Sequence, residues 1–125
     1  MTDEPLTPLA AYYQALDGGD LEATLACFTD DAVYVRPSLA VELEIVRGRR
    51  PLRAFFEARV KRPYRHTVVA SVSNGQGCFV EGVAGMPGEP PTHTFLVHAT
   101  IAPDGRISRY FALMADAPPR WSSFA

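Results

Sequence analysis

The sequence has few of the features that mark membrane, secreted or nucleic-acid-binding proteins. No apolar run in its 125 residues approaches the ~20 residues of a membrane-spanning helix, and the N-terminus lacks a basic-then-apolar signal pattern. The formal net charge of −2 gives no electrostatic basis for binding nucleic acid or an anionic membrane. We therefore expect a cytoplasmic protein of one domain, because the length suits a single domain and 47% of the residues are apolar.

Residues that bind metals or form disulfides are also scarce. The two cysteines, Cys27 and Cys78, fit no metal spacing, so we expect buried thiols in a reducing compartment rather than a disulfide. The three histidines, His66, His93 and His98, lack ligand-like spacing, and we predict no metal site. The chain has no glycine-rich phosphate loop, nucleophile elbow or cysteine–histidine pairing, so its motifs do not support nucleotide binding or covalent catalysis, and we predict no cofactor.

The most informative stretch of the sequence begins with two predicted helices. Apolar residues recur at helical spacing, as Leu6, Leu9, Tyr13 and Leu16 in the first helix and Leu21, Leu25 and Phe28 in the second. Gly18-Gly19 separates the two helices, and Asp20 is placed to cap the second. After Asp30-Asp31, β-branched and aromatic residues predict a strand over 32–36, which Pro37 ends because proline has no N–H to donate.

The rest of the chain predicts one further helix and five further strands. Residues 41–46 alternate with period two, which predicts a short strand returning beside the first. Pro51 is placed at the first position of a third helix, Pro63 ends it, and its apolar face comprises Leu52, Phe55, Phe56 and Val60. The remaining predicted strands are 66–73, 78–85, 92–102 and 106–115. Helices that precede a four-strand meander exclude a doubly wound sheet and predict an α+β fold, with the helices on the concave side of a curved, mainly antiparallel sheet.

These segments resemble the start of the nuclear transport factor 2-like superfamily, and most closely its ketosteroid isomerase and polyketide cyclase (SnoaL-like) branch. The resemblance is carried by Tyr12, the LDGGDLEA and FTDDAVY segments and Pro37, with weaker matches in GRRPLRAFFEA and in the last two strands. It covers nearly the whole chain and implies a single domain over residues 1–125, a cone-shaped α+β barrel with a mostly apolar pocket at its open end. Such motifs specify a fold well and a reaction poorly.

Strand alternation predicts which side chains face this pocket, once one inward residue per strand is taken from the resemblance. The polar residues expected there are Tyr12, Tyr34, Arg36, His93 and Tyr110. We interpret Tyr34 and Tyr110 as packing aromatics that contact a substrate. The expected apolar wall consists of Phe56, Val80, Phe95, Val97, Ala112 and Met114.

Comparison with known relatives argues for one catalytic residue and against two known mechanisms. Tyr12 matches the tyrosine that donates a hydrogen bond to the substrate oxygen in ketosteroid isomerase, although a core tyrosine bonded to a backbone carbonyl explains it equally well. Arg36 stands where that isomerase has its aspartate base, and Val97 where it has its protonated aspartic acid. Steroid isomerisation by that mechanism is therefore not supported. Ala112 stands about where limonene epoxide hydrolase, another relative, needs an aspartate, so the hydrolase machinery is not present either.

Arg36 and His93 are the charged and titratable candidates. An inward Arg36 needs a counter-charge, because an arginine cannot lose its charge through a pKa shift. Glu42 or Glu44 can supply it in a structural ion pair, and a ligand oxygen is the alternative. His93 is the candidate base because an imidazole titrates near neutral pH, but its place near a strand start equally suits a rim residue without a chemical role.

The other polar residues are interpreted without a function. Arginines cluster at the start of the third helix, where a cationic helix N-terminus can hold an anion, but we expect them simply to be solvated; they are Arg47, Arg49, Arg50 and Arg53. His66 and His98 are interpreted as isolated residues on the other face of the sheet or at strand ends.

Three hypotheses for the function follow. The first is a cofactor-independent isomerase, cyclase, lyase or hydrolase for a small, mostly apolar carbonyl compound, in which Tyr12 donates a hydrogen bond, Arg36 stabilises negative charge and His93 transfers the proton. The second is a non-catalytic module that binds such a ligand. The third is an interaction protein with a filled pocket. The outward residues expected to mediate assembly are Phe79, Val83, Leu96 and His98, and the resemblance implies a homodimer through this face under every hypothesis.

Overall fold

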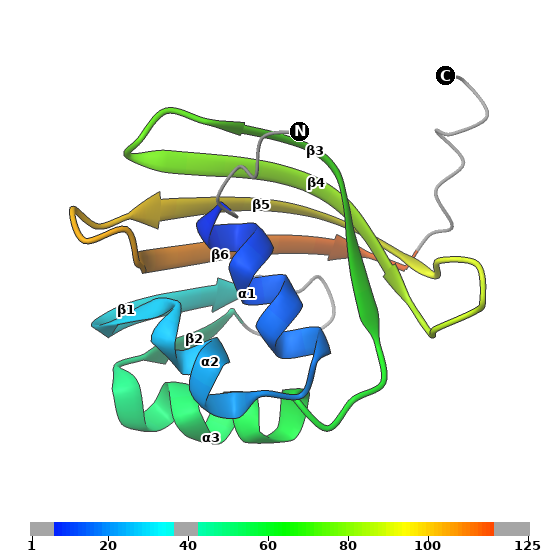
Figure 1. Cartoon of the computed structure of the whole chain (residues 1–125), viewed down its shortest axis with the longest axis horizontal. Helices are drawn as coiled ribbons and strands as arrows, with labels where there is room; N and C mark the ends of the chain where they lie inside the picture. The colour runs from blue at the N-terminus through cyan, green and yellow to red at the C-terminus, as the bar shows by residue number, and fades with distance from the viewer. Residues whose placement is uncertain (1–6, 37–42, 117–125) are drawn as a thin grey trace, which may run out of the picture.

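The computed structural model of the protein describes residues 7–36 and 43–116. Within these ranges it contains three helices, α1 (Pro8–Asp17), α2 (Leu21–Ala26) and α3 (Arg49–Arg59). Its strands are β1 (Phe28–Arg36), β2 (Glu44–Arg47), β3 (Arg65–Ser73), β4 (Gly77–Gly85), β5 (His93–Ile101) and β6 (Ile107–Ala115). The helices pack on one side of a single curved sheet, which confirms the predicted α+β fold (Figure 1). No helix in the described part of the chain is long and apolar enough to cross a membrane.

The six strands follow the order β2-β1-β6-β5-β4-β3 across the sheet. Strands β3 to β6 form the predicted antiparallel meander, and β2 returns antiparallel beside β1. Side-chain alternation did not predict the position of β1 in the sheet. This strand pairs in parallel with β6, the last strand of the meander. This pairing sets Tyr34 of β1 opposite Tyr110 of β6. Two residues far apart in the sequence therefore become neighbours on one face.

The ends of the first two helices follow their local sequence. Thr7 caps α1, because its side-chain hydroxyl accepts a hydrogen bond from the Ala10 amide at 3.1 Å. The glycine pair follows the helix as predicted, and Gly19 has a φ of 74°, a backbone conformation that costs glycine little. Asp20 caps α2 as predicted, since its carboxylate accepts a hydrogen bond from the Ala23 amide at 3.0 Å.

The start of β1 differs from the prediction. Phe28, expected on the apolar face of the second helix, begins β1 and pairs with Ile107 of β6. The register then shifts between Phe28 and Val33, so Asp30-Asp31 lies within an irregular part of the strand and not in a turn. Burial against the sheet explains the difference, because the Phe28 side chain is completely buried there.

The arginines at the start of α3 were expected to be simply solvated, and this is wrong for Arg49, which makes partly buried contacts. Arg49 donates to the Leu25 carbonyl at 2.7 Å and to the Asp30 carboxylate at 2.7 Å, which ties α3 to α2 and β1. Arg53 forms two hydrogen bonds with Glu22 of α2. The helix also begins at Arg49, so that Pro51 is its third residue rather than its first. A proline is tolerated there because the first amides of a helix have no partner within it.

The core lies between the helices and the sheet face that carries Tyr34, Phe95, Val97 and Tyr110, which we call the inner face. Aromatic rings dominate it, and Tyr12 is at their centre, with ring centroids 5.2 Å from Phe28 and 5.3 Å from Tyr110. Aliphatic side chains complete the packing, and they include Leu9, Leu16, Leu25, Leu52 and Ile107. Each such side chain contributes roughly 1.5–3 kcal/mol by leaving water. Both cysteines are free thiols, Cys78 buried and Cys27 half-buried.

Some of the predicted features lie outside the described residues. They are Leu6 of the first helix, Pro37, and the first two residues of the strand predicted over 41–46, which include Glu42.

Candidate active site

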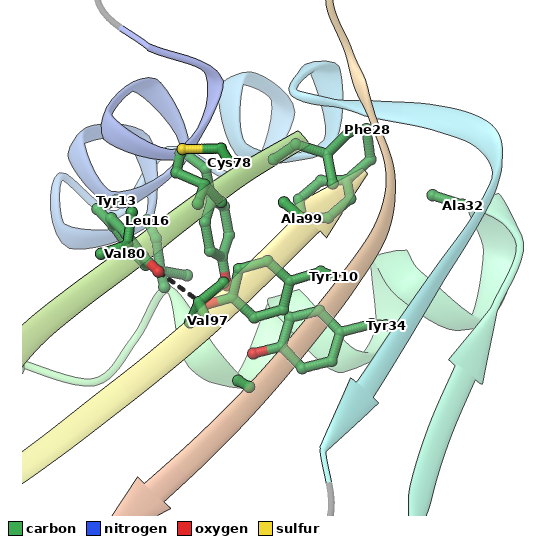
Figure 2. Packing of buried hydrophobic residues seen from close by; sticks show 14 of the residues in the cluster. Tyr13, Leu16, Phe28, Ala32, Tyr34, Cys78, Val80, Val97, Ala99 and Tyr110 are labelled. Atoms are coloured by element: carbon green, nitrogen blue, oxygen red, sulfur yellow. Dashed lines mark hydrogen bonds between the residues drawn. The ribbon is translucent and has the colours of Figure 1, made fainter. Parts of the chain in front are cut away.

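Four tyrosines converge on the inner face of the fold. Tyr12 and Tyr13 come from α1, Tyr34 from β1 and Tyr110 from β6, and each is less than 5% exposed. The hydroxyls of Tyr13 and Tyr110 are 2.9 Å apart and hydrogen-bonded, as Figure 2 shows. The Tyr34 ring stacks on Tyr110 with centroids 4.5 Å apart. These residues, which we call the tyrosine cluster, place several phenol groups inside an apolar environment.

Three phenols of this cluster, those of Tyr12, Tyr13 and Tyr110, are neutral hydrogen-bond donors. Burial raises the pKa of Tyr12 and Tyr110 well above the usual tyrosine value of 10.0, and neighbouring tyrosines raise it further. Burial also raises the pKa of Tyr13, although its hydrogen bond with Tyr110 acts in the opposite direction. When one hydroxyl of the Tyr13–Tyr110 pair donates to the other, the accepting hydroxyl keeps its own proton for another acceptor. A substrate oxygen could be that acceptor.

The residues predicted to form the apolar wall lie near this cluster, with one exception. Five of them are buried on the inner side of the fold: Phe56, Val80, Phe95, Val97 and Ala112. Figure 2 shows Val80 and Val97 beside the hydrogen bond that joins Tyr13 to Tyr110. Met114 pairs with Phe95 across the sheet but is 43% exposed, so it lies at the rim.

Arg36 lies at the end of β1 and is half-exposed. Its Nε atom is 3.6 Å from a carboxylate oxygen of Glu44, the residue directly opposite on β2. This is the structural ion pair that we weighed against a ligand contact. Such a partly exposed pair contributes at most about 1 kcal/mol to stability, because water and salt screen it. The guanidinium group therefore has a partner without being deeply buried.

His93 begins β5 and has a partner for each ring nitrogen. Its Nδ1 lies 2.8 Å from the Thr92 hydroxyl, and its Nε2 lies 2.9 Å from a carboxylate oxygen of Asp116. Asp116 is 92% exposed, which places this contact at the surface. The ring of Tyr64 approaches the His93 ring edge-on, with centroids 6.0 Å apart. The arrangement suits a residue at the rim of the inner face, and its role as a base stays a prediction.

Sequence reasoning missed a partly buried pair between Asp17 and His66. Nδ1 of His66 lies 2.7 Å from Oδ1 of Asp17, and the His66 backbone N–H donates to Oδ2 at 2.6 Å. Only 16% of the His66 side chain and 14% of the Asp17 side chain are exposed. The interpretation of His66 as an isolated residue was therefore wrong. No local motif could reveal the pair, because 49 residues separate its members.

Other inner-face residues surround the pair. The Tyr13 ring stacks on His66, with centroids 5.1 Å apart and an interplanar angle of 15°. Phe95 meets the same imidazole edge-on at 5.6 Å. In the register of the sheet, His66 is opposite Ala84, which is in turn opposite His93. Both histidines therefore lie in one row across the inner face. In residues 7–36 and 43–116, no group of three or more potential metal ligands occurs.

The opposite side of the sheet, which we call the outer face, is apolar and is not covered by the three helices (Figure 1). It carries a groove of about 440 Å³ along β3 to β6, lined mainly by Val72, Phe79, Leu96, His98, Phe111 and Leu113. Phe79 is 62% exposed, and its ring lies 4.5 Å from that of His98. Val83 was expected on this face but is only 8% exposed, so it adds little to it.

Comparisons with known proteins agree with this architecture. The structure superposes with the epoxide hydrolase/cyclase-like enzyme SalBIII, which acts in pyran ring formation in the polyether salinomycin (TM-score 0.70, 19% identity, 86% of this chain and 88% of that one). It is also similar to a proposed ketosteroid isomerase from Kribbella flavida (0.70, 21%, 94% and 84%). A third similar structure is a proposed polyketide cyclase from Sinorhizobium meliloti (0.67, 24%, 84% and 92%). These identities are low, so the likeness establishes the fold alone.

The sequence itself supports a closer assignment. No curated protein matches the chain. The model of the SnoaL-like domain, however, matches residues 9–110. This range includes α1 from Leu9 onward, the strands that carry His66 and His93, and β6 as far as Tyr110. The chain therefore belongs to the SnoaL-like domain family, whose fold it shares from α1 to β6.

Proposed function

We propose that this protein is a cofactor-independent enzyme of the isomerase or cyclase type, acting on a small, mostly apolar carbonyl compound at the inner face. The observation that carries the proposal is the tyrosine cluster, in which the Tyr13 and Tyr110 hydroxyls meet at 2.9 Å inside the fold. Packing alone does not require these hydroxyls, because replacing both partners of a buried hydrogen bond by apolar groups of the same shape can be nearly neutral or even stabilising. Retaining phenols there is consistent with a hydrogen-bonding task.

The chemistry that this cluster supports is stabilisation of an enolate. A carbonyl oxygen gains negative charge when a proton leaves the neighbouring carbon, and a neutral phenol donor stabilises that charge strongly in an apolar environment. Tyr12 and the Tyr13–Tyr110 pair are the donors in this proposal. Arg36, at the rim, keeps its predicted role of orienting the substrate or balancing its charge. Its ion pair with Glu44 is long, at 3.6 Å, and partly exposed, so exchanging it for a ligand oxygen costs little.

Binding of β-naphthol tests the donor role. This planar, apolar molecule carries an oxygen in the position of an enolate oxygen, and its fluorescence reports both binding and ionisation. We expect Tyr110→Phe and Tyr13→Phe each to weaken binding about 10-fold, the effect of one lost hydrogen bond to a buried, partly charged oxygen. Tyr64→Phe removes a hydroxyl outside the cluster and is the matched control. Equal affinity in all four proteins, or no binding to the wild type, would reject the proposal.

A second experiment separates an enzyme from a binding module. Native mass spectrometry with small-molecule extraction identifies a compound that copurifies with the protein and so provides the substrate class for assay. Arg36→Ala and His93→Ala are then compared with the wild type at saturating ligand. An enzyme loses turnover under these conditions, whereas a binding module loses affinity only.

The outer face favours an additional proposal, that two copies of this chain associate through it. Its exposed residues form a continuous apolar surface across four strands, and such surfaces on soluble domains mark contact sites. Charges of both signs accompany it, since Glu81 borders the groove and Arg109 lies on the same face of β6, over the Phe111 ring. A two-fold axis can bring the acidic group of one copy near the basic group of the other.

A further inference from the structure

The partly buried Asp17–His66 pair carries chemistry that the proposed function does not yet use. We infer that His66 is the catalytic residue that removes the proton from the substrate, and that Asp17 is the positioning residue that holds it. The inference rests on the proposed function and names the base for the same site. It assigns to His66 the role that the sequence suggested for His93.

The hydrogen bonds of Asp17 determine which nitrogen of His66 is basic. A carboxylate only accepts hydrogen bonds, so Nδ1, at 2.7 Å from Oδ1, carries a proton. The lone pair of the neutral imidazole is therefore on Nε2. Oδ2 accepts from the His66 backbone N–H at 2.6 Å, which holds the carboxylate in place on the other side. Among the described residues, Nε2 of His66 has no hydrogen-bond partner, whereas both ring nitrogens of His93 have one.

Among the described residues around His66, the nearby cation Arg65 does not compete with the imidazole for the Asp17 carboxylate. From α1, Asp17 and the Tyr13 phenol face it. From β3, the Arg65 guanidinium donates to the backbone carbonyl of Asp17 at 2.9 Å, and not to its carboxylate. On β4, the residue opposite His66 is Ala84, and the residue opposite Ala84 on β5 is His93. Phe95, also on β5, contacts the His66 ring. A carboxylate that is free of other cations stabilises the imidazolium that forms when Nε2 gains a proton.

Tyr13 connects this pair to the oxygen-binding phenols. One face of its ring stacks on His66 at 5.1 Å, while its hydroxyl bonds to Tyr110 at 2.9 Å. A carbonyl oxygen at the phenols and an acidic carbon near His66 are therefore separated by about the span of one aromatic ring. Phe95 contacts both rings, with centroids 5.6 Å from His66 and 5.5 Å from Tyr13, and gives this region an apolar wall. The spacing suits a small cyclic ketone.

The step that follows is balanced without any co-reactant. Nε2 of His66 forms an N–H bond with the proton on the carbon beside the carbonyl, and the C–H electron pair forms a carbon–carbon double bond. The π electrons of the carbonyl move to its oxygen, which accepts hydrogen bonds from the phenols. Return of the proton from Nε2 to a different carbon completes an isomerisation. Alternatively, the enolate carbon attacks an electrophilic carbon of the same molecule and closes a ring. The oxygen on the attacked carbon then either leaves or becomes an alkoxide, and it takes the proton from Nε2.

Exchange of the α-protons of β-tetralone in heavy water, followed by proton NMR, tests the inference. This small ketone exchanges its protons only through an enolate, so the assay needs no knowledge of the natural substrate. We expect His66→Gln to lower the exchange rate at saturating ketone by about 10²–10⁴-fold, the usual contribution of a general base. A glutamine can still donate a hydrogen bond to Asp17 but has no basic nitrogen. Asp17→Asn is expected to cost about 10–100-fold, as loss of an orienting partner does.

Readouts beyond rate separate a chemical role from a structural one. A rate that depends on a general base varies with pH, and His66→Gln is expected to remove the part of this variation that belongs to the base. In the tetralone-free wild type, nitrogen NMR is expected to show the proton of the neutral His66 ring on Nδ1. Added imidazole is expected to restore exchange to His66→Gly. A neutral ring protonated on Nε2 would overturn the inference even if the variants fold poorly.

The outcomes distinguish failure of the inference from failure of the proposed function. If the wild type catalyses exchange and His66→Gln does so equally well, or if His93→Gln loses more, then the base is not His66 while the proposed function stands. If the wild type binds β-tetralone but exchanges its protons no faster than buffer does, the inference fails and the result favours a binding module over an enzyme. If the wild type neither binds the ketone nor exchanges its protons, both proposals fail together.

Discussion

The two faces of the sheet are built from the same alternating strands but differ in what they contain. The inner face is covered by the helices and encloses phenols and a carboxylate–imidazole pair among its aromatic rings. The outer face is equally apolar in its exposed groove but has no comparable arrangement of buried polar groups within the described residues. Taking polar groups out of water costs free energy that an apolar core avoids, so the side of the sheet that holds them is the side on which we expect chemistry. The outer face suits association.

The largest difference in stability between the faces is expected from truncating one phenylalanine on each. Phe56→Ala removes a completely buried ring that contacts Tyr12 and Phe28, and we expect a loss of about 3–5 kcal/mol in the free energy of unfolding. Phe79→Ala on the outer face is expected to change the unfolding free energy of the monomer by no more than about 0.5 kcal/mol. Urea unfolding measures both. Similar losses would show that the outer face is also part of a packed core.

The second prediction concerns alkaline pH, where only the inner face is expected to respond. The folded-state pKa values of Tyr12, Tyr13 and Tyr110 are raised, so these phenols stay protonated in the folded protein while those of the unfolded chain ionise. The stability that they contribute is fully present below pH ~10 and is lost as the pH rises above it. Unfolding curves between neutral pH and strong alkali measure the slope. Tyr13→Phe is expected to make the slope shallower, because it removes one of the three phenols with a raised pKa.

The third prediction tests the outer face by adding a charge. Leu96→Glu places a carboxylate beside Glu81 in the apolar groove, and we expect it to convert a dimer into a monomer. Sedimentation velocity measures the change. Lys61→Glu, which alters charge at an exposed position after α3, is the matched control and should leave the dimer intact. A monomeric wild type, or a dimer unaffected by Leu96→Glu, would contradict association through this face.

The smallest effect on stability is expected at the rim between the faces. Arg36→Ala removes a long and partly exposed ion pair with Glu44, so the unfolding free energy should fall by less than about 1 kcal/mol. Ligand affinity or turnover is expected to fall by more than stability does. Measuring both in one variant shows whether Arg36 acts on the ligand. A stability loss as large as that of Phe56→Ala would instead make it a structural residue.

Local signals made the fold predictable. The Asp20 cap, the Gly18-Gly19 break and the meander were all confirmed, because each depends on hydrogen bonds or side-chain alternation within a few residues. The start of β1 was placed wrongly because Phe28 fits a helical stripe as well as a strand. Its pairing with Ile107, which comes late in the chain, decided between the two.

The candidate site was predictable only in part. The sequence indicated Tyr12, Tyr34 and Tyr110 as inner-face residues, and the structure places all three in one cluster. Tyr13 was identified only as part of the apolar stripe of its helix, so its hydroxyl contact with Tyr110 was not foreseen. The ties from Arg49 to α2 and β1 were missed for a similar reason, since they join residues that the sequence separates.

The sequence alone determined the segregation of helices from strands, the caps and turns, and the alternation that gives each strand an inner and an outer side. These follow from interactions between near neighbours in the chain. Only the tertiary structure decided that β1 pairs in parallel with β6, that Asp17 meets His66, and that the Tyr13 hydroxyl reaches Tyr110. These contacts depend on how separate elements pack, because a side chain's partner across the core is set by the burial of whole faces and not by its neighbours in sequence.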